Sequence, residues 1–515
     1  MVYTRQASLL LVAVWLVIGS PNDRKVSAQT ADGGSQVAET SLGKAIYDAQ
    51  CSVCHGENGD GKGSAAFLLK PKPRDFTLAT FKFRSTPTGS LPIDEDLVRT
   101  IRNGIPGTSM PAWKWLSDAE LTATVDHIKT FSEIWDEEEP EEVVEIGPPP
   151  DCSPAVTRRG AAVYERARCG QCHGPRGEGD GPAAPTLKDD AGLPISAYDF
   201  TRGGRMKGGS TAADIFRTFS TGLAGTPMPA YEGVFPTEDL WALTCHVIGL
   251  GSGKPTPPVP TNELVVARGS LSTTVTPTDA AFESALPATI SLRPLFAQGG
   301  SVDYLTARAV TDGSRLAIRV EWADDRQDNR PLRHEDFRDA VAIQFPISSG
   351  GTASETTFHG MGSRGAPVNI WHWKADWQIE VSRRDEINSV YPGMVVDTYP
   401  GDSFGNMFVT AAAAGNLISE QSKRTSPIED LNAVGHGTLT SQRPDQQNVE
   451  GSGVYTDGHW SVVFVRELLP GGPRDATIAQ SGQIAFAVWD GSSGDRNGQK
   501  AASEWLTCTF QASSP

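Results

Sequence analysis

The sequence predicts a multidomain protein in which two all-α modules precede an all-β domain. Three observations carry this prediction. A Cys-x-x-Cys-His pentapeptide occurs twice, at 51–55 and 169–173, and each copy is followed by an amphipathic helix pattern. Glycine and proline are abundant, with 53 and 36 residues, which suits loop-rich modules and β structure better than helical bundles. Beyond residue 260, short β-type runs alternate with turn signals.

Composition changes along the 515 residues divide the chain into domains and linkers. Charged or proline-rich stretches mark the boundaries, because such stretches do not bury a core. We expect a leader at 1–28, a first module at 40–135, an acidic linker at 136–150, a second module at 151–250, a proline-rich linker at 251–260 and a β domain at 261–515.

Residues 1–28 have the features of a secretory signal. Arg5 precedes the apolar run 9–18, and Val26-Ser27-Ala28 is a small-x-small cleavage site. The apolar run is short for a bilayer span, and an uncleaved N-terminal anchor is the alternative. No other segment of the sequence is long and apolar enough to cross a membrane. The sequence therefore predicts a periplasmic protein without a membrane span after cleavage, with any membrane association made through partners.

The two pentapeptides have the pattern of c-type haem attachment. Cys51 and Cys54 are followed by His55, and the second copy has the same order. In this chemistry two thiols add to the haem vinyl groups and the adjacent imidazole binds the iron. A single copy would also fit a zinc half-site, but two matched copies favour two covalent c haems. The second set consists of Cys169, Cys172 and His173.

A methionine at constant spacing completes each predicted site. Met110 follows His55 by 55 residues, and Met228 follows His173 by the same number. Both lie in a Gly-Thr-x-Met-Pro-Ala frame, which indicates an internal duplication. A thioether opposite an imidazole gives a six-coordinate electron-transfer haem. The alternative, that each methionine only packs a core, does not explain the equal spacing.

Residues 40–135 and 155–250 each resemble a small class I cytochrome c domain. The first begins with a predicted helix from Leu42 to Gln50. Ser117 and Glu120 form a capping-box pattern ahead of a closing amphipathic helix. The apolar positions expected to face the core are Leu121, Val125 and Ile128 in the first module, and Leu240, Leu243 and Val247 in the second.

The net charge of −17 and the isoelectric point near 5.0 exclude some partners. Nucleic acid and anionic membrane surfaces are unfavourable partners for such a chain. An acidic surface suits docking to a basic redox partner, although a solvated acidic surface is the more common reason for such a charge. The basic stretch from Lys70 to Arg84 could meet haem propionates, but we expect it to be solvated.

Three cysteines remain after the four in the haem motifs are assigned. Cys152 precedes the first helix of the second module and Cys245 lies in its last helix, and these helices pack together in the cytochrome c fold. A disulfide between them is one possibility in an oxidising compartment, and two free buried thiols are the other. Cys508 has no evident partner in the sequence.

After residue 260 the pattern is that of a sandwich or barrel of antiparallel strands. Asp312-Gly313 and Asp457-Gly458 are hairpin-type turns. The expected strands include 264–267, 316–322, 340–345, 368–380, 459–466 and 483–489.

The run from Met361 to Gln378 resembles the haem-b gamma subunit of ethylbenzene dehydrogenase, whose relatives serve dimethyl sulfide dehydrogenase, selenate and chlorate reductases and nitrite oxidoreductase. Residues 485–491 and 495–500 add to this resemblance, which covers 260–515. It implies a β-sandwich that binds one non-covalent haem b through Met361 and Lys500. A lysine binds iron only as the neutral amine, so burial must lower its pKa. Lys374, His359 and His372 are competing ligands.

The resemblance implies an electron-transfer subunit without a catalytic site of its own. Its partners would be an iron–sulfur beta subunit and a molybdopterin alpha subunit of the dimethyl-sulfoxide-reductase family. The c haems would exchange electrons with a soluble cytochrome c or a terminal oxidase. The known gamma subunits stand alone, whereas this chain carries two fused modules. The alternatives are a freestanding multihaem cytochrome, a haem peroxidase-like enzyme, and a β domain that binds carbohydrate or another partner.

Overall fold

The computed structural model describes residues 42–202, 206–252, 258–296, 302–347, 361–362, 365–381, 391–393, 426–469, 471–478 and 481–511. The predicted leader at 1–28 and the competing ligand His359 lie outside these residues.

The first part of the chain is helical, as its apolar spacing predicts. Residues 42–46 form an α-helical turn that continues as the π-helix η1 (Tyr47–Cys51) and then α2 (Ser52–His55). The remaining elements are η2 (Ala66–Leu68), α3 (Asp94–Asn103), α4 (Asp118–Lys129) and α5 (Ile134–Glu137). The capping box of Ser117 and Glu120 is confirmed, with both reciprocal hydrogen bonds present at the start of α4.

The second part repeats this plan. Its elements are α6 (Pro154–Arg166), α7 (Gly170–His173), η3 (Ala184–Thr186), η4 (Phe200–Arg202), α8 (Ala212–Thr221) and α9 (Thr237–Leu250). Thr211 and Asp214 form a second capping box at the start of α8. Leu240, Leu243 and Val247 of α9 are buried, as predicted.

A glycine lies where the first and last helices of each part cross. A Cβ added to Gly43 would come within 1.9 Å of the carbonyl oxygen of Ala123 in α4. A Cβ added to Gly160 in α6 would likewise come within 1.9 Å of the carbonyl oxygen of Ala242 in α9. Only glycine permits backbones to approach this closely, so the duplication extends to the packing of the helices.

Two of the three cysteines outside the haem motifs form a disulfide. Cys152 is bonded to Cys245 of α9, with their Cα atoms 5.3 Å apart. The bond joins the segment ahead of α6 to the last helix of the same part. Cys508 is a buried free thiol in the β domain.

The C-terminal part is a large β domain, which confirms the predicted change from helices to strands after residue 260. Its longer strands are β1 (Glu263–Arg268), β4 (Tyr304–Thr311), β5 (Arg315–Ala323), β6 (Ala340–Pro346), β7 (Val368–Lys374), β8 (Ile428–Ala433), β10 (Glu450–Thr456), β11 (His459–Glu467), β12 (Ser481–Trp489) and β14 (Leu506–Phe510). Short strands are β2 (Ala288–Ser291), β3 (Arg293–Pro294), β9 (Thr440–Ser441) and β13 (Ala501–Ala502). The hairpin turns Asp312-Gly313 and Asp457-Gly458 join β4 to β5 and β10 to β11, as expected.

Two expectations for this domain were wrong in part. The run 368–380 is not one strand, because β7 ends at Lys374 and α10 (Ala375–Glu380) follows. The sheet is not wholly antiparallel, because β1 pairs in parallel with both β14 and β4. These pairings join segments far apart in the sequence, so local sequence patterns do not predict them.

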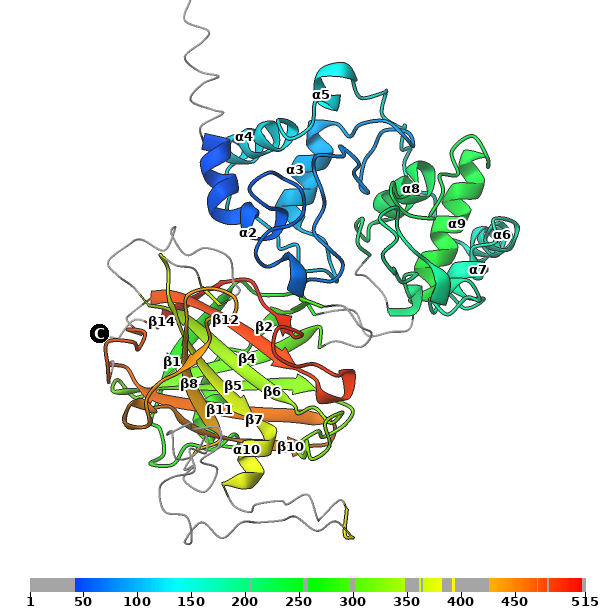
Figure 1. Cartoon of the computed structure of the whole chain (residues 1–515). Coiled ribbons are helices and arrows are strands. Elements are labelled where there is room, and N and C mark those ends of the chain that lie inside the picture. The colour runs from blue at the N-terminus through cyan, green and yellow to red at the C-terminus, as the bar shows by residue number, and fades with distance from the viewer. Residues whose placement is uncertain are drawn as a thin grey trace, which may run out of the picture.

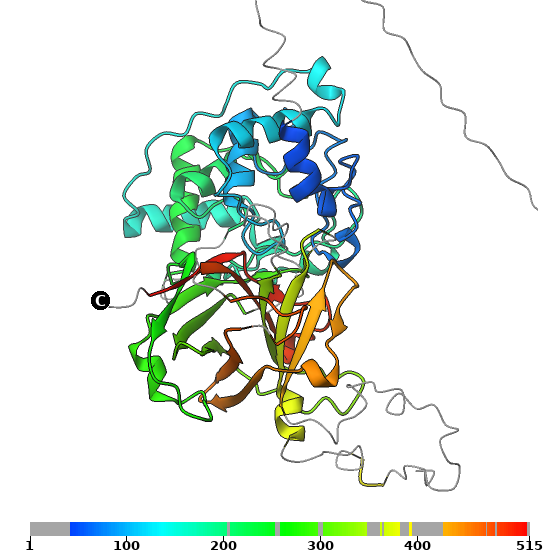
Figure 2. The ribbon, with the colours of Figure 1, turned by 90° about the vertical axis from the view of Figure 1, so that its left-hand side faces the viewer.

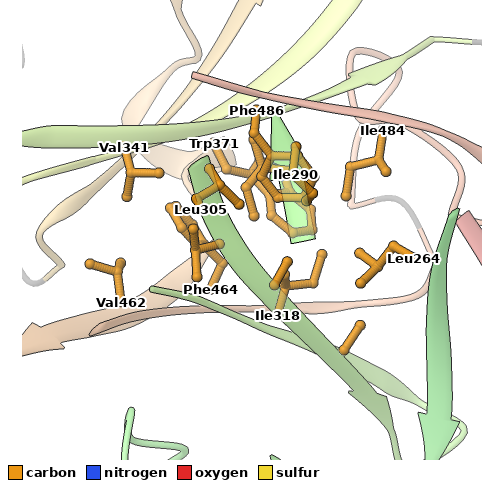
Figure 3. Packing of buried hydrophobic residues seen from close by; sticks show 14 of the residues in the cluster. Leu264, Ile290, Leu305, Ile318, Val341, Trp371, Val462, Phe464, Ile484 and Phe486 are labelled. Atoms are coloured by element: carbon orange, nitrogen blue, oxygen red, sulfur yellow. The ribbon is translucent and has the colours of Figure 1, made fainter. Parts of the chain in front are cut away.

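The sheet folds over one core. Hydrogen bonds run in the order β10-β11-β5-β4-β1-β14-β12-β6-β7-β8-β9, so β12 joins two sets of strands. Ile318 on β5 and Phe464 on β11 belong to the first set, Val341 on β6 and Trp371 on β7 to the second, and all four pack in one buried cluster (Figure 3). This arrangement matches two layers of a sandwich that remain connected along β12.

The helical parts lie on one side of the β domain (Figures 1 and 2). The backbone N–H of Lys70 donates to the carbonyl of Leu295 over 3.2 Å, and that of Ala112 donates to Glu504 Oε1 at 2.8 Å. Arg293 donates to the carbonyl of Met110 at 3.1 Å. The predicted methionine ligand of the first module is therefore fixed in part by the β domain.

None of the helices in the described ranges has the length and apolar character needed to cross a membrane.

Candidate functional site

The predicted ligands of the first c haem line one cavity. Cys51, Cys54 and His55 come from the η1–α2 turn, and Met110 comes from the loop after α3. The cavity wall is otherwise mainly apolar. It includes Leu69, Pro71, Pro73, Phe76, Phe81, Phe83, Leu97, Ile101, Ile105, Trp113 and Ile128. Two thiols, an imidazole and a thioether around an apolar cavity form the donor set that a c haem needs.

The imidazole of His55 is held in one orientation. Its Nδ1 lies 2.9 Å from the carbonyl oxygen of Arg74, and its ring stacks on Phe76 at 4.4 Å between centroids. A ring that donates from Nδ1 presents the lone pair of Nε2, which is how protein imidazoles are prepared for a metal. Burial lowers the pKa of His55 to about 4, so the ring is neutral at physiological pH.

His173 in the second module has matching contacts. Its Nδ1 lies 2.9 Å from the carbonyl oxygen of Tyr198, and its ring stacks on Phe200 at 4.5 Å. Burial also lowers the pKa of His173. Both motif histidines are thus neutral and oriented by a backbone carbonyl.

The methionine loop is also built in the same way twice. The N–H of Met110 donates to Thr108 Oγ1 at 3.2 Å, and that hydroxyl donates to the carbonyl of Ile105 at 2.8 Å. Ile105 closes the loop, because its N–H donates to the carbonyl of Met110 at 3.0 Å. The corresponding distances among Met228, Thr226 and Leu223 are 3.2, 2.8 and 3.1 Å. The Gly-Thr-x-Met-Pro-Ala frame therefore encodes a turn that holds the methionine in place.

The four motif thiols are free in the structure. Cys51 and Met110 both pack against the core of the first module, and Cys169 and Met228 against that of the second. Burial raises the pKa of Cys51 and of Cys54 to about 12, because the surroundings of both sulfurs are apolar. The donor sets fit c haems, which when bound supply one-electron transfer.

In the β domain, the predicted haem-b ligands lie near one aromatic side chain. Lys500 Nζ lies 4.8 Å from the ring centroid of Trp489, and His372 stacks on that ring at 4.7 Å. Met361 packs in the same apolar cluster as Trp489. The fold thus brings Met361, Lys500 and His372 to one face of the strands β6, β7 and β12.

The chemistry of these groups fits a metal-bound cofactor. Burial lowers the pKa of Lys500 to about 8, which makes the neutral amine accessible. The Nε2 atom of His372 is buried without a hydrogen-bond partner, and burial holds the pKa of this ring well below its usual range. An orphaned buried nitrogen is costly unless something absent from the structure binds it. His372 therefore stays a competitor of Lys500 as a ligand.

Lys374 is a weaker competitor than the sequence suggested. Lys374 is 4% exposed as a residue, and its amine pairs with Glu429, which is also 4% exposed. Its amine additionally lies 3.7 Å from the ring centroid of Trp377. A buried lysine that already has a carboxylate partner would have to leave that anion unpaired in order to bind iron.

Met361 has an unusual backbone. Its φ is 64°, a left-handed conformation that is uncommon for a residue with a side chain. Its N–H donates to Gln344 Oε1 at 3.2 Å, and its carbonyl accepts from Gly435 at 2.9 Å. Such strain is found where the surroundings fix a functional side chain. Sequence reasoning missed Gln344 and Trp489, since neither has a signature of its own.

One expectation about charge was wrong. Arg84 in the basic stretch is 1% exposed rather than solvated, and its guanidinium donates to backbone carbonyls, including that of Thr221 in the second module at 2.9 Å. Arg74 and Lys82 from the same stretch line the first cavity.

Three segments of the chain match families of known proteins. Residues 277–501 match the family described as ethylbenzene dehydrogenase, and residues 38–128 and 155–247 match that described as cytochrome c oxidase, cbb3-type, subunit III. The chain is therefore similar to the ethylbenzene dehydrogenase family in its C-terminal part and to the cytochrome family in its two N-terminal parts. The resemblance drawn from the sequence is thereby confirmed.

Three curated relatives align over about two fifths of this chain. A protein described as a respiratory nitrate reductase heme subunit from Haloferax mediterranei is 28% identical over 41% of this chain and 57% of its own length. Chlorate reductase subunit gamma from Ideonella dechloratans is 26% identical over 40% and 64%. Dimethylsulfide dehydrogenase subunit gamma from Rhodovulum sulfidophilum is 26% identical over 39% and 58%. The chain thus spans less than two thirds of each relative.

One solved structure shares more sequence. A chain of the Kuenenia stuttgartiensis reducing HAO-like protein complex is 42% identical, and the match covers 41% of this chain and 95% of that one. The TM-score of this match is 0.40.

Proposed function

We propose that this chain is a periplasmic electron-transfer subunit that carries two covalent c haems and one non-covalent b haem. It has no catalytic site of its own. The observation that carries the proposal is the joining of two duplicated thiol–imidazole–thioether sites to an ethylbenzene dehydrogenase-type domain. The domain limits 40–135, 151–250 and 261–515 are part of this proposal.

The iron ligands follow from the same proposal. His55 with Met110 and His173 with Met228 bind the c haem irons, and Met361 with Lys500 binds the b haem iron. Six-coordinate irons leave no open position for a substrate, which favours electron transfer over peroxidase chemistry. The lowered pKa of Lys500 supports its role as a neutral ligand.

The partners are proposed from the relatives. Two of them are named gamma subunits of oxidoreductases and a third a heme subunit of a nitrate reductase. We infer that the β domain of this chain docks on an iron–sulfur beta subunit bound to a molybdopterin alpha subunit. The c haems then exchange electrons with a soluble cytochrome c or a terminal oxidase. The net charge of −17 suits steering toward a basic partner.

Contacts between the first module and the β domain suggest the order of the relay. Cys54 of the haem motif and Ala487 of β12 pack against one small buried cluster of Leu69, Leu295 and Ala502. Ala487 lies two positions before Trp489, on the same face of β12, and Trp489 contacts Lys500. The first c haem would therefore lie next to the b haem site.

The first module also contacts the second. The guanidinium of Arg84 and the hydroxyl of Thr88 both donate to the carbonyl of Thr221, at 2.9 and 2.7 Å. We therefore place the first c haem between the b haem and the second c haem. Electrons pass along this order in either direction.

Rapid-mixing spectroscopy tests the order. Cys51→Ala with Cys54→Ala removes the first c haem and should stop electron exchange between the b haem and the second c haem. The matched pair Cys169→Ala with Cys172→Ala should leave exchange between the b haem and the first c haem intact. Equal exchange in both variants would contradict the order. Purification of the complex from the native host, with molybdenum absent from every fraction that contains this chain, would contradict the proposed partners.

A further inference from the structure

Cations from both modules meet at the mouth of the first haem cavity. Arg74 and Lys82 belong to the first module, and Lys207 belongs to the second, yet all three line this cavity. Nothing in the function proposed above requires a residue of the second module at the first haem site.

The segment that carries Lys207 is held against the first module. The N–H of Met206 donates to Ser210 Oγ at 3.0 Å, and the N–H of Gly209 donates to the carbonyl of Met206 at 3.0 Å, which closes a turn around Lys207. A Cβ on Gly208 would lie 3.2 Å from Phe83 of the first module, so the turn is in close contact there. The position of Lys207 is therefore set by packing.

The cluster gathers three cations, and the carboxylates of Asp75, Asp189 and Asp190 offset part of their charge. Burial lowers the pKa of Lys82 to about 8, and the charges of Arg74 and Lys207 lower it further. Asp189 and Asp190 attract Lys82 more weakly than these two cations repel it. Lys207 lines the cavity but is itself an exposed residue. Like charges gathered beside a partly buried cavity are unfavourable unless an anion binds among them.

A c haem brings such an anion, because each haem carries two propionate carboxylates. We propose that Lys207, together with Lys82 and Arg74, binds a propionate of the first haem, so that both modules hold this one cofactor. The inference rests on the proposed function only in requiring a covalent haem in the first module. Ammonium and guanidinium groups form strong hydrogen bonds with carboxylates, and these are strengthened where water is partly excluded.

The two c-haem sites differ in the residue whose carbonyl accepts from the motif histidine. Tyr198 stands in the second module where Arg74 stands in the first, because both residues supply the carbonyl that accepts from the motif histidine. The cation contributed by Arg74 at the first site therefore has no counterpart at the matching position of the second. A positive charge near a haem favours the reduced iron, which carries one positive charge less than the oxidised iron. Lys207 should thus raise the reduction potential of the first haem and leave that of the second unchanged.

Spectroelectrochemical titration of the full-length, haem-loaded protein tests this proposal. Lys207→Gln should shift the potential of the first haem downward, Lys207→Glu should shift it further, and Lys207→Arg should keep the original value. Met228→Ala identifies the wave of the second haem, which should not move in the Lys207 variants. Lys188→Gln is the matched control, because it removes an exposed lysine of the same module that does not line the cavity. An unchanged first potential in Lys207→Glu would overturn the proposal.

Lysine acetylation followed by mass spectrometry gives a second readout on otherwise native protein. Lys207 should react more slowly in the haem-loaded protein than in the variant Cys51→Ala with Cys54→Ala, whereas Lys188 should react equally in both. Equal reactivity of Lys207 in the two proteins would contradict a bond to the propionate. Absence of covalent haem from the first module of the unaltered protein would instead contradict the proposed function, and intact mass distinguishes the two results.

Discussion

In the helical modules the residues expected to bind one haem are close in sequence, whereas in the β domain they are far apart. Met110 follows Cys51 by 59 positions, and Lys500 follows Met361 by 139. The first site is built from two tight turns, one around the Cys-x-x-Cys-His motif and one around the methionine. The b-haem site in the β domain needs strands β6, β7 and β12 to pair before its residues meet. A local site can be copied by duplication, and this chain contains two copies.

The largest expected effect is the loss of a covalent haem. Cys51→Ala with Cys54→Ala should reduce the haem retained after acid–acetone extraction from two per chain to one, because no thioether can form in the first module. Cys169→Ala with Cys172→Ala should do the same for the second. Intact mass makes the measurement. One haem already in the unaltered, fully matured protein would refute the duplicated assignment.

Removal of the proposed b-haem ligand is expected to have the next largest effect. Lys500→Ala should leave the b iron five-coordinate or water-ligated and shift its potential, while both c haems remain unchanged. Optical and electron paramagnetic resonance spectra report the change. Lys374→Ala is the control, because Lys374 is paired with Glu429 and should not alter the b-haem spectrum even if it lowers stability.

His372 is the alternative ligand of the b-haem iron, and its variant separates the two assignments. If His372→Ala abolishes b-haem binding and Lys500→Ala does not, the imidazole is the ligand. The electron-transfer function would survive that result, and the ligand assignment would not. The buried, unpartnered Nε2 of His372 is the reason to make this variant.

Loss of a methionine ligand should have a selective effect on one c haem. Met110→Ala should allow one carbon monoxide molecule per reduced chain to bind and should lower the potential of the first c haem, since the thioether favours the reduced state. Met228→Ala should do the same for the second. Carbon monoxide difference spectra measure the binding. If neither property changes in either variant, another residue is the ligand.

Local sequence patterns predict much of the helical part, whereas the residues of the b-haem site were named from the family resemblance alone. The Ser117–Glu120 capping box and the Asp312-Gly313 and Asp457-Gly458 turns depend on neighbours in the chain, and all three were found where expected. The parallel pairing of β1 and the end of β7 at Lys374 depend on distant partners. The approach of Lys207 to the first cavity also depends on how the modules pack, and no local pattern encodes it.

A smaller effect should show how closely the helices of each module approach. Gly160→Ala should lower the free energy of unfolding by about 1–3 kcal/mol, because the new Cβ meets the carbonyl of Ala242. Gly249→Ala in α9 is the matched control, since its nearest neighbour atom would lie 3.8 Å away, at ordinary contact distance. Thermal unfolding of the haem-loaded protein measures both. Equal melting temperatures for the two variants would contradict the close crossing of α6 and α9.

The pH dependence of b-haem uptake is the smallest expected effect. Iron binds only the neutral amine, and the pKa of Lys500 is lowered to about 8. Affinity for haem should therefore fall about tenfold for each pH unit below 8, because one proton must be displaced, and should level off above that value. Haem titration of protein freed of its b haem gives the slope. Lys500→Ala should remove the slope, and a slope that continues to pH 10 would mean that burial does not lower this pKa.

The pyridine haemochrome spectrum of the full-length protein, recorded before and after acid–acetone extraction, tests the account most directly. It separates covalent from non-covalent haem and therefore compares the two kinds of site in one sample. The account predicts c and b haem in a ratio of two to one, with both c haems retained by the chain and the b haem extracted. Correctly folded protein with no extractable haem, or with one retained haem instead of two, would contradict it.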